Sequence, residues 1–195
     1  MLALLAGLAI TACGGGANAS ADPGSTGPGA SSGALSGAKI VNDKFSSVVP
    51  QGWENTLGNP AEVQKLSADG KLLYLVEQGP PGQSPQPNVN DVRANINVVL
   101  LTQPVPDDQV STYLTSVSRN GASHLSATQA FAIRADSGLY ITYDRDIQGT
   151  PGESRDMIIN HGGATFHIVL NTSHFAFAQQ LPALQALLTA WKWSS

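Results

Sequence analysis

Cysteine is the scarcest informative residue of this 195-residue chain. It occurs once, at Cys13, so the chain can form no internal disulfide and has no CxxC pair for zinc or redox chemistry. The fold must therefore be stabilised by a packed core alone.

Charge is scarce as well, at 12% of residues with a formal net charge of -4. The ten Lys and Arg residues are scattered along the sequence and form neither a basic patch nor a basic helix face. Proteins that bind nucleic acid collect such residues on one surface. We therefore expect no nucleic-acid partner.

The sequence also has no motif that commits it to catalysis. A G-x-S-x-G nucleophile elbow is absent, since Gly82-Gln83-Ser84-Pro85 only approximates one, and no phosphate-binding glycine motif occurs. We expect no catalytic residues, no metal and no cofactor.

A short apolar run, residues 1–10, leads to Ile10-Thr11-Ala12-Cys13-Gly14. It is too short to cross a bilayer, which takes about 20 apolar residues, and it has the length of a signal-peptide core. The small residues before the cysteine resemble the lipobox of bacterial lipoproteins, so we predict a signal peptide at 1–12 and lipid attachment at Cys13. Because no Lys or Arg precedes Cys13, we expect the natural start upstream of Met1. The alternative is a chance cysteine in a disordered N-terminus.

Residues 13–38 continue almost entirely with Gly, Ala, Ser, Pro and Thr, and Leu35 is the one bulky apolar side chain. Such a segment cannot bury enough surface to order itself, and a flexible chain of this length reaches roughly 25–30 Å. We predict a tether that holds a domain at the outer face of the cell membrane. Two or three acyl chains on Cys13 would anchor it there, so the membrane is its first expected partner.

Residues 39–195 suit a single domain, and most of it has the pattern of strands. Segments 45–50, 72–76 and 94–100 predict three strands that make the first half of a sheet. The second of them is apolar on both faces, whereas the third alternates between apolar and polar residues, as a half-buried strand does.

Three later segments predict the rest of the sheet. Segments 128–134 and 138–147 are further strands, and 156–171 folds into a hairpin at Gly162-Gly163. The connections are short enough for the strands to be antiparallel.

Two helices are predicted. The first begins at Asp107 or Asp108, whose carboxylates can cap free N–H groups, and ends at Asn120-Gly121. The second covers 176–191, with Pro182 in its first turn or at a kink. Their apolar stripes are Val110, Tyr113, Leu114 and Val117, and then Phe177, Leu181, Leu184, Leu188 and Trp191. Each stripe can be buried only against the sheet, so we predict an α+β fold with a central antiparallel sheet and helices packed on it.

The element order of residues 39–195 resembles a known family. A strand reading FSSVVPQGW, a mid-chain helix, a GLYITYD strand with a following hairpin and a closing helix with Pro in its first turn are similar to the PsbP-like α/β/α sandwich. With the lipobox and the tether, the chain resembles the LpqN/LpqT-type lipoproteins of mycobacteria and relatives. The resemblance implies a role in the mycobacterial envelope near trehalose-lipid transport, or an accessory or assembly role.

The first candidates for a site are three histidines near the end of the chain, His161, His167 and His174. A two-residue turn at Gly162-Gly163 places His161 opposite Ala164 and His167 opposite Ile158. Alternation along the strands then sends His161 and His167 to opposite faces of the sheet. They cannot share a metal, and we interpret them as ordinary structural residues.

Four carboxylates are the second candidates: Asp144, Asp146, Glu153 and Asp156. A catalytic pair would need two of these acids, or one of them with His167, to meet in a cleft. Because Arg145 and Arg155 are interleaved with the acids, we expect ion pairs on an exposed sheet face instead.

Aromatic residues are more suggestive of binding. Most of them should be core, but Trp193 is expected to point away from the stripe that carries Trp191. The candidate ligand or partner surface is Trp53, Tyr140, Tyr143, Trp191 and Trp193. The Pro-rich segment 79–87 is either a mobile rim over a pocket or partner surface, or plain disorder.

The function favoured by the sequence is that of a non-catalytic envelope lipoprotein. Its domain would bind an apolar or glycolipid ligand, or help to deliver one, in a pocket between sheet and helix. One alternative is an interaction module that docks on a larger membrane complex, and another is a hydrolase of envelope esters or sugars. The sequence indicates no oligomeric state.

Overall fold

The computed structural model describes residues 37–58, 70–79, 93–119, 121–147 and 149–194. The predicted signal peptide, Cys13 and all but the last two residues of the predicted tether lie outside these ranges. The predicted rim or disordered segment at 79–87 also lies outside them, except for Gly79.

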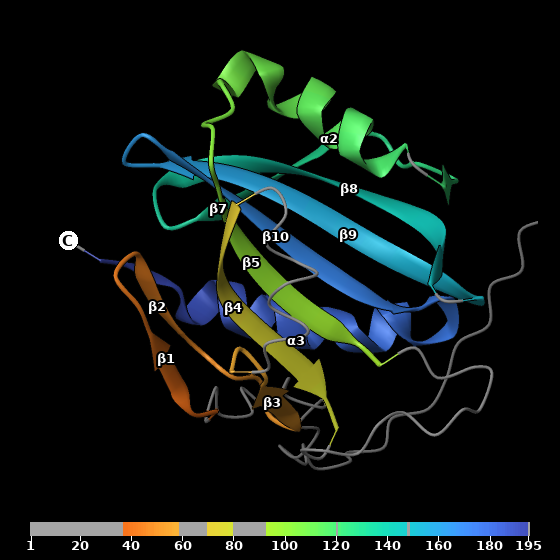
Figure 1. Ribbon diagram of the computed structural model, residues 1–195, viewed down its shortest axis with the longest axis horizontal. Coiled ribbons are helices and arrows are strands. Elements are labelled where there is room, and N and C mark those ends of the chain that lie inside the picture. Colours follow the sequence, from red (N-terminus) through yellow and green to blue (C-terminus); the bar gives the residue numbers. More distant parts are fainter. Residues whose placement is uncertain (1–36, 59–69, 80–92, 120, 148, 195) are drawn as a thin grey trace, which may run out of the picture. The chain divides into compact units, whose positions relative to one another are not determined.

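An eight-stranded antiparallel main sheet forms the centre of the domain (Figure 1). Its strands, from one edge, are β3 (Trp53–Asn55), β4 (Gly70–Gln78), β5 (Asn95–Leu101), β10 (Ala164–Ser173), β9 (Thr150–His161), β8 (Asp136–Ile147) and β6 (Ala122–Ser123), and β7 (Gln129–Ile133) also pairs with β8. Consecutive strands lie mostly side by side, as short connections require.

One helix packs on each face of the main sheet, as Figure 1 shows. The 3-10 turn η1 (Asp107–Gln109) leads into α2 (Val110–Ser118), which contacts β8 and β9. On the other face, η2 (His174–Ala176) leads into α3 (Phe177–Ala190), which contacts β10. The predicted sandwich is confirmed. Within the described ranges, neither helix is long and apolar enough to cross a membrane.

The structure contradicts the predicted carboxylate cap and one of the two positions predicted for Pro182. No side chain caps the start of η1, because Asp107 Oδ1 instead accepts a hydrogen bond from Asn160 Nδ2 at 2.6 Å. Pro182 lies inside α3 and not in its first turn, since the helix begins at Phe177, directly after η2.

A small second sheet contains both ends of the described chain. Its strands are β1 (Lys39–Val41), β2 (Phe45–Val48) and β11 (Lys192–Trp193), with β2 in the middle. The prediction that 45–50 belongs to the main sheet was wrong. A turn at Gly52, where φ is +78°, separates β2 from β3, and the Phe45 ring stacks on Trp191 at 3.8 Å. This packing holds β2 over the start of β11.

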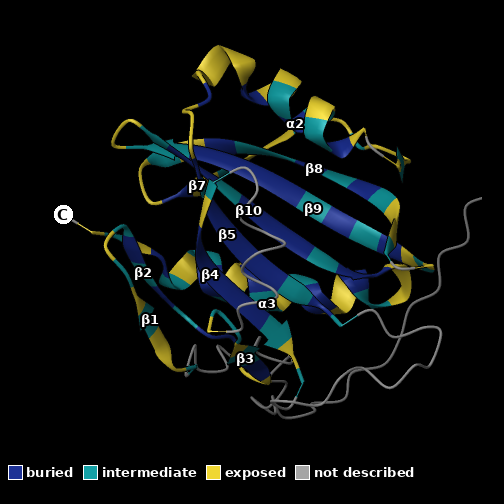
Figure 2. Cartoon of the chain, in the orientation of Figure 1, coloured by how far each residue is buried: buried dark blue, intermediate teal, exposed yellow. Residues whose placement is uncertain are grey.

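The core has two parts, one on each face of the main sheet. The larger part lies on the α3 face and the smaller lies beneath α2. Central strands are buried on both faces, as the dark blue of Figure 2 shows. This confirms the prediction for β4, whereas β5 was predicted as half-buried and is buried on both faces. Its polar Asn97 is only 2% exposed and donates to Asn95 Oδ1 at 3.4 Å.

The β9–β10 hairpin has the predicted register. Gly162 and Gly163 form its turn at φ values of +58° and +76°, a region that suits glycine. His161 pairs with Ala164 and Ile158 pairs with His167. The two histidines therefore lie on opposite faces, as predicted.

Candidate functional site

A groove runs along α3 and is called here the α3 groove. It has a volume of about 370 Å³ and lies between α3 and the chain that leads from β2 through β3. Val49, Trp53 and Gln78 line its strand side, and Gln179, Gln180 and Ala183 line its helix side. None of the described residues that line it carries a charge.

The chemistry of the α3 groove is that of amides beside small apolar groups. Each glutamine amide can both donate and accept hydrogen bonds. Gln180 is only 6% exposed, although it lies on a helix that otherwise buries apolar side chains. The side chains of Ala183 and Ala186 are short, which leaves room for a ligand on this side of α3. Such a groove suits an uncharged molecule with hydroxyl groups.

A second groove, of about 450 Å³, lies between β7 and the C-terminal half of α3. Arg134 lines it, and its Nε donates to the carbonyl oxygen of Trp191 at 2.8 Å. The arginine therefore ties β7 to the end of α3, and the second groove differs from the α3 groove in having a charged wall.

The five predicted aromatic residues do not form one surface. Trp191 is fully buried against Phe45, and Tyr143 is buried on the α2 face. Trp53 is 8% exposed and lines the α3 groove. Tyr140 and Trp193 are partly exposed on the α3 face, apart from that groove.

Three of these residues, Tyr143, Tyr140 and Trp193, are held in place by hydrogen bonds or ring contacts. Tyr143 donates to Asp156 Oδ2 at 3.3 Å, and burial, with the nearby Asp156 charge, raises the pKa of its phenol to about 12. Tyr140 donates to Gln129, and Arg155 lies 4.5 Å above its ring. Trp193 stacks on His161 at 4.1 Å.

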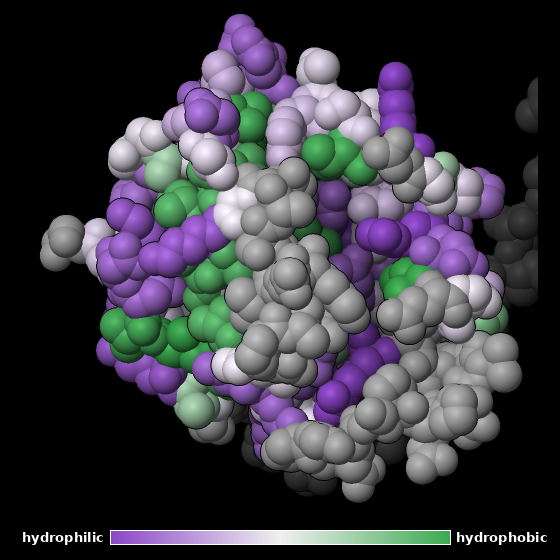
Figure 3. Space-filling view, in the orientation of Figure 1, coloured by the Kyte–Doolittle hydropathy of each residue, from purple (hydrophilic) through white to green (hydrophobic). Residues whose placement is uncertain are grey.

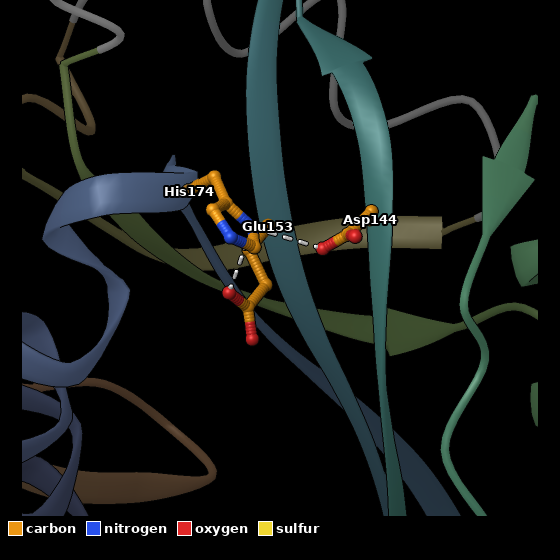
Figure 4. A group of neighbouring side chains, drawn as sticks. All are labelled: Asp144, Glu153 and His174. Atoms are coloured by element: carbon orange, nitrogen blue, oxygen red, sulfur yellow. Dashed lines mark hydrogen bonds and ion pairs between the residues drawn. The ribbon is translucent and has the colours of Figure 1, made fainter.

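Figure 4 shows a second candidate site, the acid–histidine cluster of Asp144, Glu153 and His174. Asp144 on β8 and Glu153 on β9 are directly opposite each other in the strand register. His174, in the turn after β10, places its Nδ1 3.1 Å from Asp144 Oδ1 and 3.4 Å from Glu153 Oε2. One potential ligand atom from each of the three residues lies within 4.8 Å of the others.

The acid–histidine cluster brings together charges that repel. The pKa of Glu153 is raised above its usual value, chiefly because burial withdraws the carboxylate from water. His174 and Arg155 oppose this shift, and the charge of Asp144 adds to it. The side chain of Glu153 is 18% exposed, so the cluster is only partly screened by solvent.

Sequence reasoning missed the partners of these acids. Arg155 was expected to form an ion pair but lies over the Tyr140 and Phe177 rings. Histidines take that place, since His124 Nδ1 lies 2.9 Å from Asp144 Oδ2 and His174 contacts both acids. The pairing of Ile147 with Thr150, had it been recognised, would have placed Asp144 opposite Glu153.

The other predicted titratable residues lie apart from the cluster. Asp146 accepts a hydrogen bond from the Gly149 amide at 2.7 Å. His167 is on the α2 face, with its Nε2 3.5 Å from Asp156 Oδ2. Neither of the two grooves described above is lined by Asp144 or Glu153.

No protein-family model and no curated protein matches the sequence. Solved structures that are similar in fold include the following two. LpqN of Mycobacterium tuberculosis, described as involved in cell envelope biogenesis, aligns with a TM-score of 0.54 at 16% identity over 82% of this chain and 86% of LpqN. The cyanobacterial PsbP of Synechocystis sp. PCC 6803 aligns with a TM-score of 0.52 at 11% identity over 88% of this chain and 100% of its own. The chain therefore has the PsbP-like α+β fold.

Proposed function

We propose that this PsbP-like domain is a non-catalytic binding module of the cell envelope. A lipid on Cys13 anchors it to the outer face of the cell membrane, and the α3 groove binds the neutral headgroup of a glycolipid. The observation that carries the proposal is the uncharged lining of the α3 groove, in which glutamine amides lie beside Trp53.

The lining favours a sugar over a charged headgroup. A phosphate or carboxylate in the α3 groove would lose its water without gaining an opposite charge, which is costly. Sugar hydroxyls can exchange water for the amides of Gln78, Gln179 and Gln180. The volume of about 370 Å³ is within the usual range of roughly 300–1,000 Å³ for ligand pockets.

Two further observations support a place in the envelope. The run that ends at Cys13 resembles a lipobox, and the segment after it has the composition of a tether. A protein of the same fold, LpqN, is described as involved in cell envelope biogenesis.

The test is a titration of the full chain with a trehalose monoester, kept below the concentration at which the ester forms micelles. Calorimetry and tryptophan fluorescence measure binding of the ester. Ala183→Phe fills the α3 groove and should abolish binding, because Ala183 is one of its walls. Ala178→Phe is the matched control, since Ala178 is exposed on the same helix and lines neither groove. Absence of binding by the wild-type chain, or equal binding by both variants, would contradict the proposal.

Docking on a membrane complex is the second candidate function. It is favoured by Phe175, a large apolar side chain in η2 that is 79% exposed. Apolar side chains are also visible between hydrophilic ones on the face shown in Figure 3. Cross-linking from position 175 in intact cells would test this function, and recovery of no specific protein would count against it.

A further inference from the structure

We propose that Asp144, Glu153 and His174 form a binding site for a divalent transition-metal ion of the zinc type. The proposal is independent of the α3 groove, which none of the three residues lines. It rests on the positions of the donor atoms and on the residues that surround them.

The spacing of the donor atoms fits such an ion. Zinc lies roughly 2.0–2.2 Å from nitrogen and oxygen ligands, so tetrahedral ligands lie roughly 3.3–3.6 Å from each other. His174 Nδ1 lies 3.1 Å from Asp144 Oδ1 and 3.4 Å from Glu153 Oε2. His174 Nδ1 therefore lies near ligand spacing from both carboxylates, and the donor atoms of all three residues lie within 4.8 Å of one another.

Regular structure holds the three donors in place. Asp144 and Glu153 are neighbours across the β8–β9 ladder, and His174 directly follows β10, the next strand of the sheet. Three adjacent strands thus fix the backbone of the site before any ion binds. Binding would then cost little ordering of the chain.

Residues around the donors could orient them. His124 Nδ1 lies 2.9 Å from Asp144 Oδ2, the carboxylate oxygen that does not contact His174. Thr172 is fully buried, pairs with Glu153 in the strand register, and its hydroxyl has no hydrogen-bond partner among the described residues. Directly opposed residues point to the same face, so this hydroxyl is placed to hold the second oxygen of Glu153 or a metal-bound water.

The donor set indicates the class of ion. One imidazole nitrogen with two carboxylate oxygens suits zinc and its neighbours better than calcium, which prefers six to eight oxygen ligands. Three protein ligands leave a position for water or for a group of another molecule. The ion would also neutralise two carboxylates that lie side by side.

Calorimetric titration of the full chain with ZnCl2 tests the site. We expect one Zn²⁺ to bind per chain, and His174→Gln and Glu153→Gln each to weaken binding at least about tenfold, the loss that even outer residues of a metal site can cause. His124→Gln should have a smaller effect, because His124 contacts only the outer oxygen of Asp144. Cys13→Ser should bind Zn²⁺ as the wild-type chain does.

The chain contains a matched control pair. His161 Nδ1 lies 2.9 Å from Asp136 Oδ2, a similar contact without a second carboxylate. His161→Gln and Asp136→Asn should leave Zn²⁺ affinity unchanged. Equal losses in this pair and in the acid–histidine cluster would overturn the proposal, as would absence of stoichiometric binding by the wild-type chain.

A measurement on the wild-type chain covers the case in which a variant fails to fold. Co²⁺ should shift the NMR signals of the His174 ring through its unpaired electrons and leave those of His161 in place. If His174 serves only as an ion-pair partner of the two acids, Co²⁺ will leave its ring signals unmoved, and the proposal is wrong.

Discussion

Each face of the main sheet packs against one helix, but the two faces bury different chemistry. On the α3 face, Phe45, Phe166 and Trp191 are stacked or in edge contact and are at most 1% exposed. On the α2 face, Asn97 and Asp156 are buried among the apolar residues, at 2% and 4% exposure. Apolar packing dominates the first face, whereas the second depends on polar groups finding partners.

The difference has a physical consequence for stability. Burial of apolar surface stabilises without regard to direction, but a buried polar group stabilises only if its hydrogen bonds are made. Among the described residues, buried polar atoms without a hydrogen bond occur on both faces, such as Asp156 Oδ1 on the α2 face and Trp191 Nε1 on the α3 face, but the larger apolar cluster lies on the α3 face. We therefore expect most of the free energy of unfolding to come from the α3 face.

Truncation of Trp191 should have the largest effect. Trp191→Ala removes a fully buried ring that stacks on Phe45, and we expect a loss of about 3–5 kcal/mol in the free energy of unfolding. Urea denaturation followed by circular dichroism measures it. Trp193→Ala is the comparison, because Trp193 is partly exposed and should cost less.

Truncation of Leu114 tests the α2 face with a smaller effect. Leu114 is fully buried, but α2 has only nine residues and packs mainly on two strands, β8 and β9. We expect Leu114→Ala to cost about 2–3 kcal/mol, the low end for a buried leucine. A loss equal to that of Trp191→Ala in the same urea series would remove the difference between the faces.

Tyr143 offers the smallest and most specific test. Its folded-state pKa of about 12 lies above the ordinary value of 10.0 because of burial and the Asp156 charge. As pH rises, the phenol of Tyr143 loses its proton in the unfolded chain before it does so in the folded chain. Its contribution to the free energy of unfolding is therefore fully present below pH 10 and is lost as pH rises towards 12.

Tyr143→Phe should reduce that alkaline loss and cost about 0.5–1.5 kcal/mol at neutral pH, through its hydrogen bond to Asp156. Urea midpoints measured from neutral pH into this alkaline range would show it. The same alkaline loss in the variant and the wild-type chain would exclude Tyr143 as the source.

Local geometry decided what could be predicted from the sequence. The faces of His161 and His167 followed from one turn, because a two-glycine hairpin fixes the register and the register fixes each face. The place of β2 could not be read in the same way, since it depends on Trp191, which is distant in the sequence. The acid–histidine cluster needed two registers and the position of η2 at once.

The small sheet determines where a mechanical load enters the domain. β1 is the first described strand, and tension from the residues before Lys39 acts first on its pairing with β2. In that register Lys39 pairs with Val48, which is also a wall of the α3 groove. A pull on the chain before Lys39 is therefore transmitted to one side of the α3 groove before it reaches the main sheet, so the width of the groove is coupled to tension on that end of the domain.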